Sequence, residues 1–433
     1  MTEMLCPIDE AAVMAAVAAA AASGEALRIE GNGSKASMLR PVRAARTLST
    51  RALTGITLHA PQELVFSARA GTPLAVIEAA LAESGQHLIA EPPDLSALLD
   101  SAVEGGQTLG GVVATNLSGP RRIAGGAMRD HVLGVRAVNG AGELFRSGGR
   151  VLKNVTGLDL CKLLTGSHGT LGVLTEVTLK VLPVAEATGS VVVAVDGAEA
   201  GVAVLSAALG SPYGVSGACF LPAAMAARLP GLPARDLAIV RIEEFASGAA
   251  YRLERLRTEL AAHGVPSLLD DAASGAVWRG VRDVVPLVPA AGEAVWRVSV
   301  RPSRGPGMLR AAALVGARGF LDWGGGLVWL AGPANAAAHA GIAHAAREAG
   351  GVWMLLRAPD ALREAVDVVP AEPEPLARIR RRVKTALDPR GILNPGRLYA
   401  EERPGALPLD PAKGKPCKSF AVSGIGQCQR RQR

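Results

Sequence analysis

Apolar residues recur along this chain with two different spacings, which predict helices and strands that follow one another in mixed order. Residues 9–23 are rich in alanine, with Asp9 placed to cap a helix and Gly24 placed to end it. Leucine and isoleucine residues three or four positions apart predict a second helix that starts at Thr72. Alternating patterns predict strands around these helices, at 26–30, 56–60, 64–69 and 88–90. The first part of the chain is therefore expected to be α+β.

The stretch from Gly105 to Pro183 has glycines clustered at both ends and strand patterns between them. Residues 133–145 are typical of a hairpin around a tight turn at Asn139-Gly140, and residues 175–182 alternate as a further strand. Because glycine has no Cβ, backbone at such positions can approach another group closely. Two glycine clusters in one domain therefore predict a cofactor embedded in backbone.

From Val184 onward the glycine clusters disappear and strands alternate with helices, which predicts a second α+β domain. A helix at 374–387 carries one apolar stripe, made of Leu376, Ile379, Val383 and Leu387. Residues 401–433 are rich in Pro, Gly, Lys and Arg without periodicity and are predicted to be a disordered basic tail. The other elements expected in this half are strands at 190–195, 238–243, 295–300 and 352–356, a glycine-bent hairpin at 320–330, and helices at 251–263 and 334–349.

Composition places the chain among globular proteins. Its 433 residues are 49 % hydrophobic, which supports a large core and more than one domain. Aromatic residues make up only 3 %, which argues against a nucleic-acid binder that stacks bases. The net charge is +7, but from Glu401 onward seven Lys/Arg stand against three acids and supply +4 of it. Polyanion binding by the folded part therefore has little support.

Cysteine usage and the first residues bear on location. The chain has five cysteines and no Cys-x-x-Cys pair, so neither a zinc ribbon nor an iron–sulfur cluster held by this chain alone is expected. Such a sparse, odd set is typical of a reducing cytosol. Acidic residues precede the apolar N-terminal run, unlike a signal peptide, and no uninterrupted 18-residue apolar run predicts a membrane span. A cytoplasmic location is expected.

The loop Gly31-Asn32-Gly33-Ser34-Lys35 follows a predicted strand and is a candidate phosphate cradle. Successive backbone N–H groups can line a concavity there, and Lys35 adds positive charge. The spacing is neither that of a Walker loop nor that of the Rossmann Gly-x-Gly-x-x-Gly fingerprint. Taken alone, the loop is better explained as a plain turn.

Four motifs in one order carry a family resemblance: the loop at 31–35, the block Gly110-Gly111…Asn116…Ser118-Gly119, the segment 166–176, and Asp388-Pro-x-Gly-Ile-Leu-Asn-Pro-Gly-Arg. The chain resembles the vanillyl-alcohol-oxidase, or PCMH, type of FAD-binding fold. Within that superfamily it is similar to the flavin-binding E subunits of bacterial glycolate oxidases, through segments 119–122, 128–134, 152–160 and 321–330. The similarity runs from the first helix to Tyr399.

The resemblance implies two α+β FAD subdomains under an α+β cap domain. The implied division is 1–183 for the FAD-binding domain, 184–372 for the cap, 373–400 for a C-terminal helix and Asn-Pro-Gly segment that return to the FAD domain, and 401–433 for the tail. The implied FAD-binding residues are Gly31, Asn32, Gly33, Ser34 and Lys35 at the pyrophosphate, Thr108, Gly110, Gly111, Thr115, Asn116, Ser118 and Gly119 along the flavin, and Gly169, Thr170, Gly172, Val173 and Asn394 further along.

Two absences refine this resemblance. Some relatives attach FAD to a histidine after the first glycine loop, but residues 31–41 contain neither His nor Cys, so FAD is expected to be non-covalent. Metal-assisted 2-hydroxy-acid dehydrogenases of the superfamily carry a His-x-Gly-Asp-Gly-Asn-x-x-His type of cluster, which is missing here, so no metal is expected. His339 and His344 are five positions apart, unlike the i, i+4 pair that binds metal on one helix face. Both are predicted to face solvent.

Oxidation of a 2-hydroxy acid needs a hydride acceptor, a base for the hydroxyl proton and a cation for the carboxylate. Arg121 and Arg122 are candidates for the cation, since guanidinium pairs with carboxylate in a bidentate manner, and a solvated loop is the alternative for both. No base is assigned. His131 and His168 lie in flavin-type motifs, but histidines beside glycine turns are more often structural.

The resemblance implies a FAD-dependent oxidoreductase acting on CH–OH groups. It would be a subunit of a multi-subunit glycolate oxidase that converts glycolate to glyoxylate and passes electrons to a partner or a quinone-type acceptor. The implied partners are a sister flavoprotein subunit and an iron–sulfur subunit. Two alternatives stay open: a flavin relay or assembly subunit without its own chemistry, and a stand-alone FAD dehydrogenase of another small hydroxy acid. Residues 413–433 are either a solvated end or a dock for a partner or the acidic surface of the inner membrane.

Overall fold

The computed structural model describes residues 3–149 and 158–402. The predicted tail from residue 403 onward and most of the segment 152–160 lie outside the described residues. Helix α1 (Glu10–Ser23) begins and ends as its sequence predicts. The Asp9 side chain accepts a hydrogen bond of 2.8 Å from the Ala12 N–H, and Gly24 closes the helix in the left-handed conformation with a φ of 72°.

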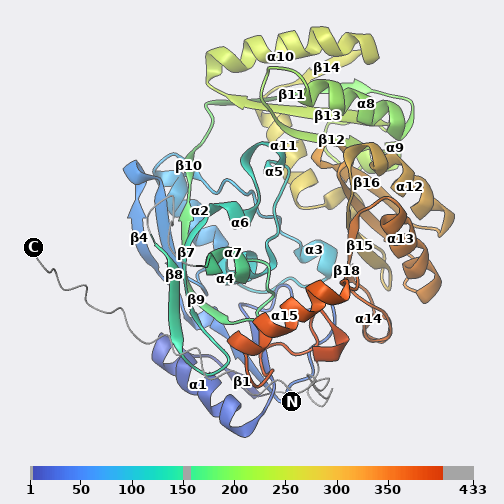
Figure 1. The fold of residues 1–433 in the computed structure, drawn as a ribbon. Helices are drawn as coiled ribbons and strands as arrows, with labels where there is room; N and C mark the ends of the chain where they lie inside the picture. Colours follow the sequence, from blue (N-terminus) through green and yellow to red (C-terminus); the bar gives the residue numbers. More distant parts are fainter. Residues whose placement is uncertain (1–2, 150–157, 403–433) are drawn as a thin grey trace, which may run out of the picture.

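The residues before Pro183 build three sheets (Figure 1). The largest is antiparallel in the order β4-β5-β9-β7-β8. Its central strand β9 is buried because its side chains pack into two apolar clusters. The others are the parallel β1-β3-β2 sheet and the β10-β6 pair. The strands are β1 (Glu3–Leu5), β2 (Leu27–Glu30), β3 (Arg46–Ser49), β4 (Ile56–Ala60), β5 (Val65–Arg69), β6 (Gln86–His87), β7 (Val132–Val138), β8 (Leu144–Gly148), β9 (Val173–Lys180) and β10 (Leu182–Pro183).

The helices of the N-terminal part are short, apart from α1 and α2. The strand predicted at residues 88–90 is wrong. Residues 88–90 form a buried turn, because Glu91 has a φ of 50° and the two prolines after it cannot donate ladder hydrogen bonds. The turn between β7 and β8 spans residues 139–143, and its left-handed residue is Gly142. The helices are α2 (Leu74–Glu83), α3 (Ser96–Leu99), α4 (Leu109–Thr115), α5 (Arg122–Gly125), α6 (Met128–His131) and α7 (Leu160–Leu164).

Residues 187–357 form one eight-stranded antiparallel sheet in the order β14-β11-β13-β12-β16-β17-β15-β18. This order contains two βαββαβ units. Within each unit, the four strands lie side by side in the order fourth, first, third, second. The two units are joined where their second strands, β12 and β16, pair with each other. The units comprise β11 (Ala187–Ala194), α8 (Gly197–Leu209), β12 (Val215–Leu221), β13 (Leu237–Glu244), α10 (Ala246–Leu260) and β14 (Pro266–Leu269), then β15 (Ala294–Ser299), α12 (Gly305–Leu314), β16 (Arg318–Asp322), β17 (Leu327–Gly332), α13 (Ala336–Glu348) and β18 (Val352–Arg357).

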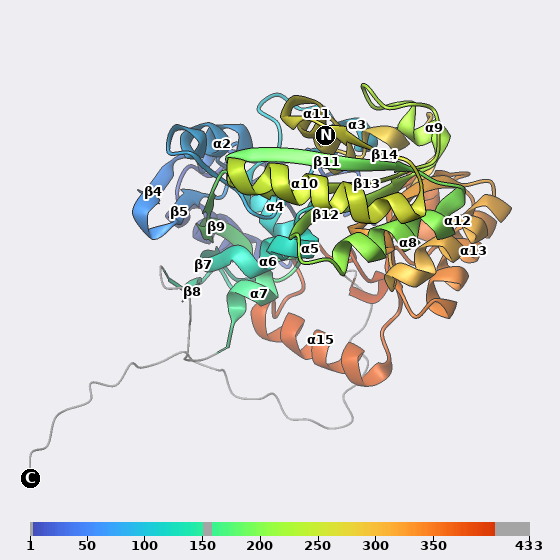
Figure 2. The same cartoon turned by 90° about the horizontal axis from the view of Figure 1, so that it is seen from above.

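Helices α8, α10, α12 and α13 cover the outer face of this sheet, so its inner face is turned toward the N-terminal part (Figures 1 and 2). A large apolar core fills the space between sheet and helices. The remaining helices are α9 (Ala223–Ala226), α11 (Asp271–Arg282), which extends from the end of β14, and α14 (Asp360–Ala365). The inner face of the eight-stranded sheet is therefore the face that lies toward the N-terminal part.

Helix α15 (Glu374–Leu387) lies at the periphery, and its apolar stripe is not its buried side (Figure 2). Leu376 and Ile379 are more than half exposed. The helix is instead anchored by Lys384, whose ammonium donates to the Asp388 carboxylate at 2.7 Å and to the carbonyl of Thr170 at 2.6 Å. After α15 the chain returns to the N-terminal part, where Leu393 forms a parallel bridge with Leu27 of β2.

Candidate active site

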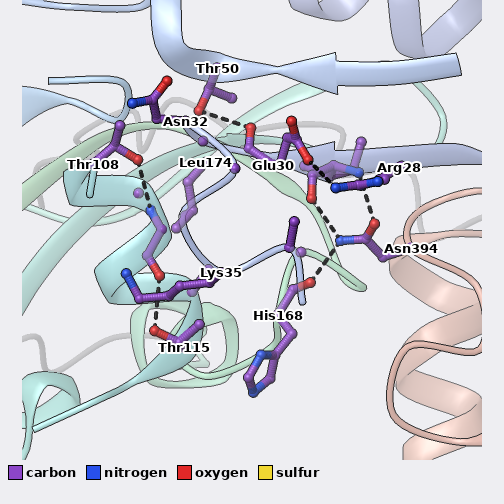
Figure 3. A pocket seen from close by; sticks show the side chains of 18 of the residues that line it. Arg28, Glu30, Asn32, Lys35, Thr50, Thr108, Thr115, His168, Leu174 and Asn394 are labelled. Atoms are coloured by element: carbon purple, nitrogen blue, oxygen red, sulfur yellow. Dashed lines mark hydrogen bonds and ion pairs between the residues drawn. The ribbon is translucent and has the colours of Figure 1, made fainter. Parts of the chain in front are cut away.

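A cavity opens between β2, α4 and the turn before β9 (Figure 3). The loop after β2 forms one wall, helix α4 a second, and the turn with the C-terminal segment a third. Of the residues predicted to bind FAD, those that line it are Gly31, Asn32, Gly33, Ser34, Lys35, Thr108, Gly110, Gly111, Thr115, Gly169, Gly172 and Asn394.

Two glycines let the walls meet closely. A Cβ on Gly31 would lie 2.1 Å from the Thr108 hydroxyl oxygen, and a Cβ on Gly110 would lie 2.8 Å from the Ala70 methyl. The Gly110 N–H donates to the carbonyl of Ala70 at 2.7 Å, which ties α4 to the end of β5. These positions are glycine because any side chain there would collide with the neighbouring segment.

The cavity is lined by cations with few acids among them. Burial lowers the pKa of Lys35 to about 8, although the charge of Asp94 acts in the opposite direction. Burial, together with the charges of Arg363 and Arg28, lowers the pKa of Arg397 to about 9. Arg28 pairs with Glu30 at 2.8 Å. The charged residues of the lining are three cations, Arg28, Lys35 and Arg397, and one acid, Glu30, so the cavity favours an anion.

Asn394 holds the C-terminal segment against this cavity. Its side-chain oxygen accepts from the Ile29 N–H at 2.8 Å, and its amide donates to the carbonyls of His168 at 2.8 Å and Ile29 at 3.1 Å (Figure 3). Asn394 and His168 both have positive φ values, 43° and 53°. The Asn394 side chain therefore connects β2 with the glycine-rich turn before β9, two segments of the cavity wall that are far apart in the sequence.

The other predicted FAD-binding residues do not line the cavity. Asn116 ends α4 and accepts from the Arg129 N–H at 3.0 Å, while Ser118 accepts from the Met128 N–H at 2.9 Å. The Gly119 carbonyl accepts from the Trp323 indole at 3.1 Å. Thr170 and Val173 contribute a carbonyl to Lys384 and an apolar side chain to the core. These five residues therefore contact other segments of the protein and do not line the cavity.

Several cavity residues were missed by the sequence analysis. They come mainly from positions next to the predicted motifs: Arg28, Ile29, Glu30, Ala36, Thr50, Ala114, Ser167, His168, Leu174 and Arg397. Arg397 was detectable, since it ends the Asn-Pro-Gly-Arg motif. Its guanidinium donates to the carbonyls of Lys35 at 2.9 Å and Ala36 at 3.2 Å and so fixes the loop from below. Thr50 and Leu174 carried no local signal.

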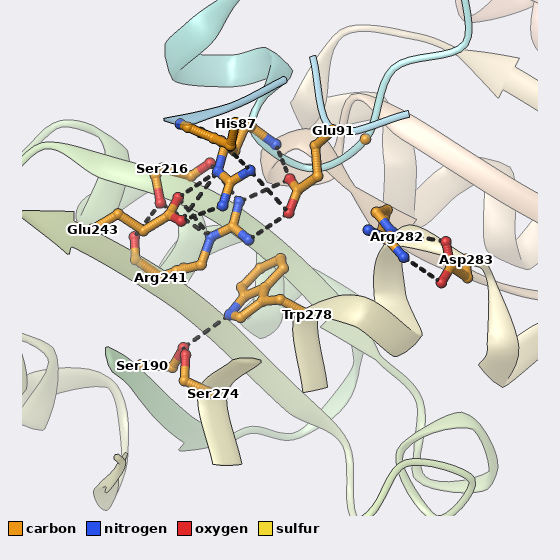
Figure 4. Close-up of polar contacts among 12 residues, drawn as sticks. His87, Glu91, Ser190, Ser216, Arg241, Glu243, Ser274, Trp278, Arg282 and Asp283 are labelled. Atoms are coloured by element: carbon orange, nitrogen blue, oxygen red, sulfur yellow. Dashed lines mark hydrogen bonds and ion pairs between the residues drawn. The ribbon is translucent and has the colours of Figure 1, made fainter. Parts of the chain in front are cut away.

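Arg121 belongs to a buried ion network that joins the N-terminal part to the eight-stranded sheet. Glu91, Arg241 and Glu243 of this network are labelled in Figure 4. Arg121 donates to both Glu243 carboxylate oxygens, at 2.9 and 2.6 Å. Arg241 donates to the two Glu91 oxygens at 2.9 and 3.1 Å. Burial alone would raise the pKa of Glu243, but hydrogen bonds from Arg121 and the charge of Arg241 outweigh it and lower that pKa to about 2. Arg121 is thus occupied by protein carboxylates, contrary to its candidacy as a substrate-binding cation.

The histidines differ in burial. His339 is buried, which contradicts the prediction that it faces solvent: its Nδ1 accepts from the Trp296 indole at 3.1 Å and its ring meets Trp353 edge to face. His344 is exposed as predicted. His131 and His168 are both buried, and burial lowers the pKa of His168 to about 3. His168 is therefore neutral at any working pH.

Among residues 3–149 and 158–402, no group of three or more His, Cys, Asp or Glu side chains is arranged to hold a metal ion. No helix there combines the length and apolar character needed to cross a bilayer.

Residues 3–148 match the family described as FAD binding domain. The chain is 38 % identical over 376 residues to glycolate oxidase subunit GlcE of Escherichia coli (strain K12), covering 87 % of this chain and 93 % of that protein. It is also 33 % identical over 143 residues to a D-lactate dehydrogenase of Archaeoglobus fulgidus, covering 33 % and 30 % of the two chains.

Among solved structures, a 4-ethylphenol oxidase from Gulosibacter chungangensis, in its isoeugenol complex, aligns with a TM-score of 0.67. The alignment covers 92 % of this chain and 90 % of that one at 15 % identity, which establishes the shared fold. The fold is thus the PCMH-type FAD-binding fold that the motifs indicate. Since the GlcE match extends over nearly the whole of both chains, this protein is a FAD-binding member of the glycolate oxidase subunit GlcE family.

Proposed function

We propose that this chain is the FAD-binding subunit of a multi-subunit glycolate oxidase that converts glycolate to glyoxylate. The observation that carries the proposal is the cationic, glycine-walled cavity, in a chain whose GlcE relative matches it nearly end to end. We divide the chain into a FAD-binding domain at 1–183, a cap at 184–372 and a returning segment at 373–400. The partners we propose are a sister flavoprotein subunit and an iron–sulfur subunit.

The residues of the cavity fit a dinucleotide with a pyrophosphate. The backbone of 31–36 and the cations Arg28, Lys35 and Arg397 surround one end, where two phosphate charges would restore the pKa values that burial lowers. Helix α4 offers a flat wall without bulky side chains at Gly110 and Gly111, suited to the flavin rings. Residues 31–41 contain no His or Cys, so we propose non-covalent binding.

In the reaction, bound FAD supplies the acceptor for hydride equivalents. The protein holds the cofactor through the 31–36 loop and positions the α4 wall beside it. The Arg121–Glu243 and Arg241–Glu91 pairs hold the cap sheet against the FAD-binding part. The bound cofactor would pass its electrons to a partner subunit or a quinone-type acceptor. We propose a cytoplasmic location, with contact at the inner membrane through partners or the tail.

A visible spectrum of the purified chain, recorded without oxygen before and after addition of glycolate, tests the proposal. We expect flavin bands that bleach with glycolate, and acid precipitation should release the flavin into the supernatant. Bands that persist with the isolated chain but bleach in the reconstituted complex would assign this subunit an electron-relay role. Bands that stay oxidised in both would leave the flavin structural and would refute the catalytic proposal.

A further inference from the structure

Two arginines from different parts of the chain contact one tryptophan beside the predicted flavin wall. The guanidinium carbon of Arg122, on α5, lies 4.4 Å from the centre of the Trp323 ring, and that of Arg297, on β15, lies 4.9 Å from it. The Trp323 indole donates to the carbonyl of Gly119, four residues beyond Thr115 on the cavity wall. The cluster therefore lies where the cap sheet meets the end of the α4 segment.

Neither guanidinium has an anionic partner among the residues that the structure describes. No hydrogen bond or ion pair joins Arg122 or Arg297 to another side chain there, and Nε of Arg297 is buried without a hydrogen-bond partner. The nearby carboxylates are engaged elsewhere: Asp130 accepts from the Ala127 N–H at 2.9 Å, and Asp322 accepts from the Trp323 N–H at 2.7 Å.

The aromatic contacts compensate these charges only in part. A cation over an indole is stabilised by the ring, but the planar donors of guanidinium remain available to a carboxylate. Burial and, to a smaller extent, the charge of Arg122 lower the pKa of Arg297 to about 10, so the two cations lie close enough to repel. An anion between them would relieve both effects. Buried polar groups without partners are uncommon in native proteins and call for an explanation.

We propose that Arg122 and Arg297 form an anion-binding site on Trp323 that takes the carboxylate of a small 2-hydroxy acid. This inference rests on the proposed function, since it names the residues that would hold that substrate class. Arg121, the neighbour of Arg122, is excluded from the role by its pairing with Glu243. Arg297 had no sequence signal, because β15 is otherwise an ordinary apolar strand.

Oxalate is a suitable probe, because it presents carboxylates and has no C–H bond to oxidise. We would titrate it into the flavin-loaded full-length chain by calorimetry and by the shift of the flavin bands. Arg122→Met and Arg297→Met should each weaken oxalate binding by about tenfold or more, as expected for the loss of a charge-assisted contact. The matched controls Arg129→Met and Arg301→Met change exposed arginines nearby and should stay within about twofold of wild type.

A measurement on the unmodified protein covers the case in which a variant fails to fold. Phenylglyoxal modifies accessible arginines, and oxalate should protect Arg122 and Arg297 from it while leaving Arg129 and Arg301 reactive. Unchanged affinity in both variants, or no protection of the two arginines, would overturn the site. If the variants weaken oxalate binding but glycolate does not bleach the flavin, the anion site stands and the proposed function fails. If glycolate bleaches the flavin in both variants as in wild type, the proposed function stands and the anion site fails.

Discussion

Replacing Arg241 by methionine tests how strongly the ion network holds the two parts of the chain together. Arg241 is only 2 % exposed and donates to both oxygens of Glu91, to the Ser216 hydroxyl at 3.1 Å and to the Ser216 carbonyl at 3.4 Å. Its guanidinium also lies 4.8 Å from the centre of the Trp278 ring (Figure 4). Methionine matches the length of the aliphatic stem and removes all four donations.

The expected loss of stability depends on the contacts that Glu91 keeps after Arg241 is replaced. In the Arg241→Met variant the Glu91 carboxylate stays buried, with the Arg121 N–H at 3.0 Å and the Arg121 guanidinium at 3.7 Å as its contacts. Removing one partner of a buried ion pair costs about 3–5 kcal/mol, because a charge is left poorly compensated in a low-dielectric site. We expect the free energy of unfolding to fall by about 3 kcal/mol, the lower end, since Arg121 still contacts Glu91.

Urea unfolding followed by tryptophan fluorescence measures this change, with Arg257→Met as the matched control. Arg257 pairs with Glu254 on the exposed face of α10, at 2.6 Å, where an exposed ion pair is worth about 0–1 kcal/mol. A loss of less than 1 kcal/mol in Arg241→Met, or an equal loss in the two variants, would refute the view that the buried network is a major contact between the two parts.

The same network fixes a pH dependence. Glu243 has a pKa of about 2 in the folded protein against an ordinary value of 4.5, so its stabilising effect is complete above about pH 4.5 and is lost as the pH falls toward 2. A shift of this size corresponds to about 3 kcal/mol. Arg121→Met, which removes the hydrogen bonds to Glu243, should flatten the stability profile in that range.

Three further predictions concern the cavity, the cap and the C-terminus. Gly31→Ala should lower the bound flavin per protein, measured from absorbance, because the new Cβ would lie 2.1 Å from the Thr108 hydroxyl; Thr108→Ala in the same chain should restore part of it, and Gly275→Ala should have no effect. Burial raises the pKa of Asp322 to about 7, so the free energy of unfolding of wild type should fall by up to about 4 kcal/mol as the pH rises from 4 to 7. In urea unfolding at pH 5 and 8, Asp322→Asn should show a smaller fall than wild type between the two pH values. A chain that ends at Glu402 should keep the flavin content and melting temperature of the full chain, whereas one that ends at Tyr399 should melt lower, because Glu401 and Glu402 pair with Arg380.

Local signals predicted many of the elements, because capping and periodicity act over a few residues. Asp9 and Gly24 bound α1 as their chemistry requires, and most strands of the eight-stranded sheet lie within a few residues of their predicted positions. The joining of two βαββαβ units through β12 and β16 was not visible, since that pairing is decided by tertiary packing. The same limit explains residues 88–90, where two prolines end an apolar run that resembles a strand.

The apolar stripe of α15 and the burial of His339 show the limits of reading a helix by its residue types. Leu376 and Ile379 look like core positions, but the side that packs contains Ala377 and Lys384. A buried lysine gives no apolar signal, because its stem fills space while its ammonium finds carbonyl and carboxylate oxygens. His339 is buried in an alanine-rich helix, where alanines on every side leave the periodicity uninformative.

Arg121 and Arg122 are adjacent in the sequence, yet the structure gives them opposite electrostatic surroundings. With Arg241, Glu91 and Glu243, Arg121 forms a set of two guanidiniums and two carboxylates with no net charge, which suits a permanent contact between two parts of a chain. Among residues 3–149 and 158–402, no acid pairs with Arg122 or Arg297 in this way, so their charge is available to an exchangeable anion. A contact that must persist is neutralised within the protein, and a site that must release its ligand is left charged. This difference is the physical reason to look for the substrate at Arg297 and not at Arg121.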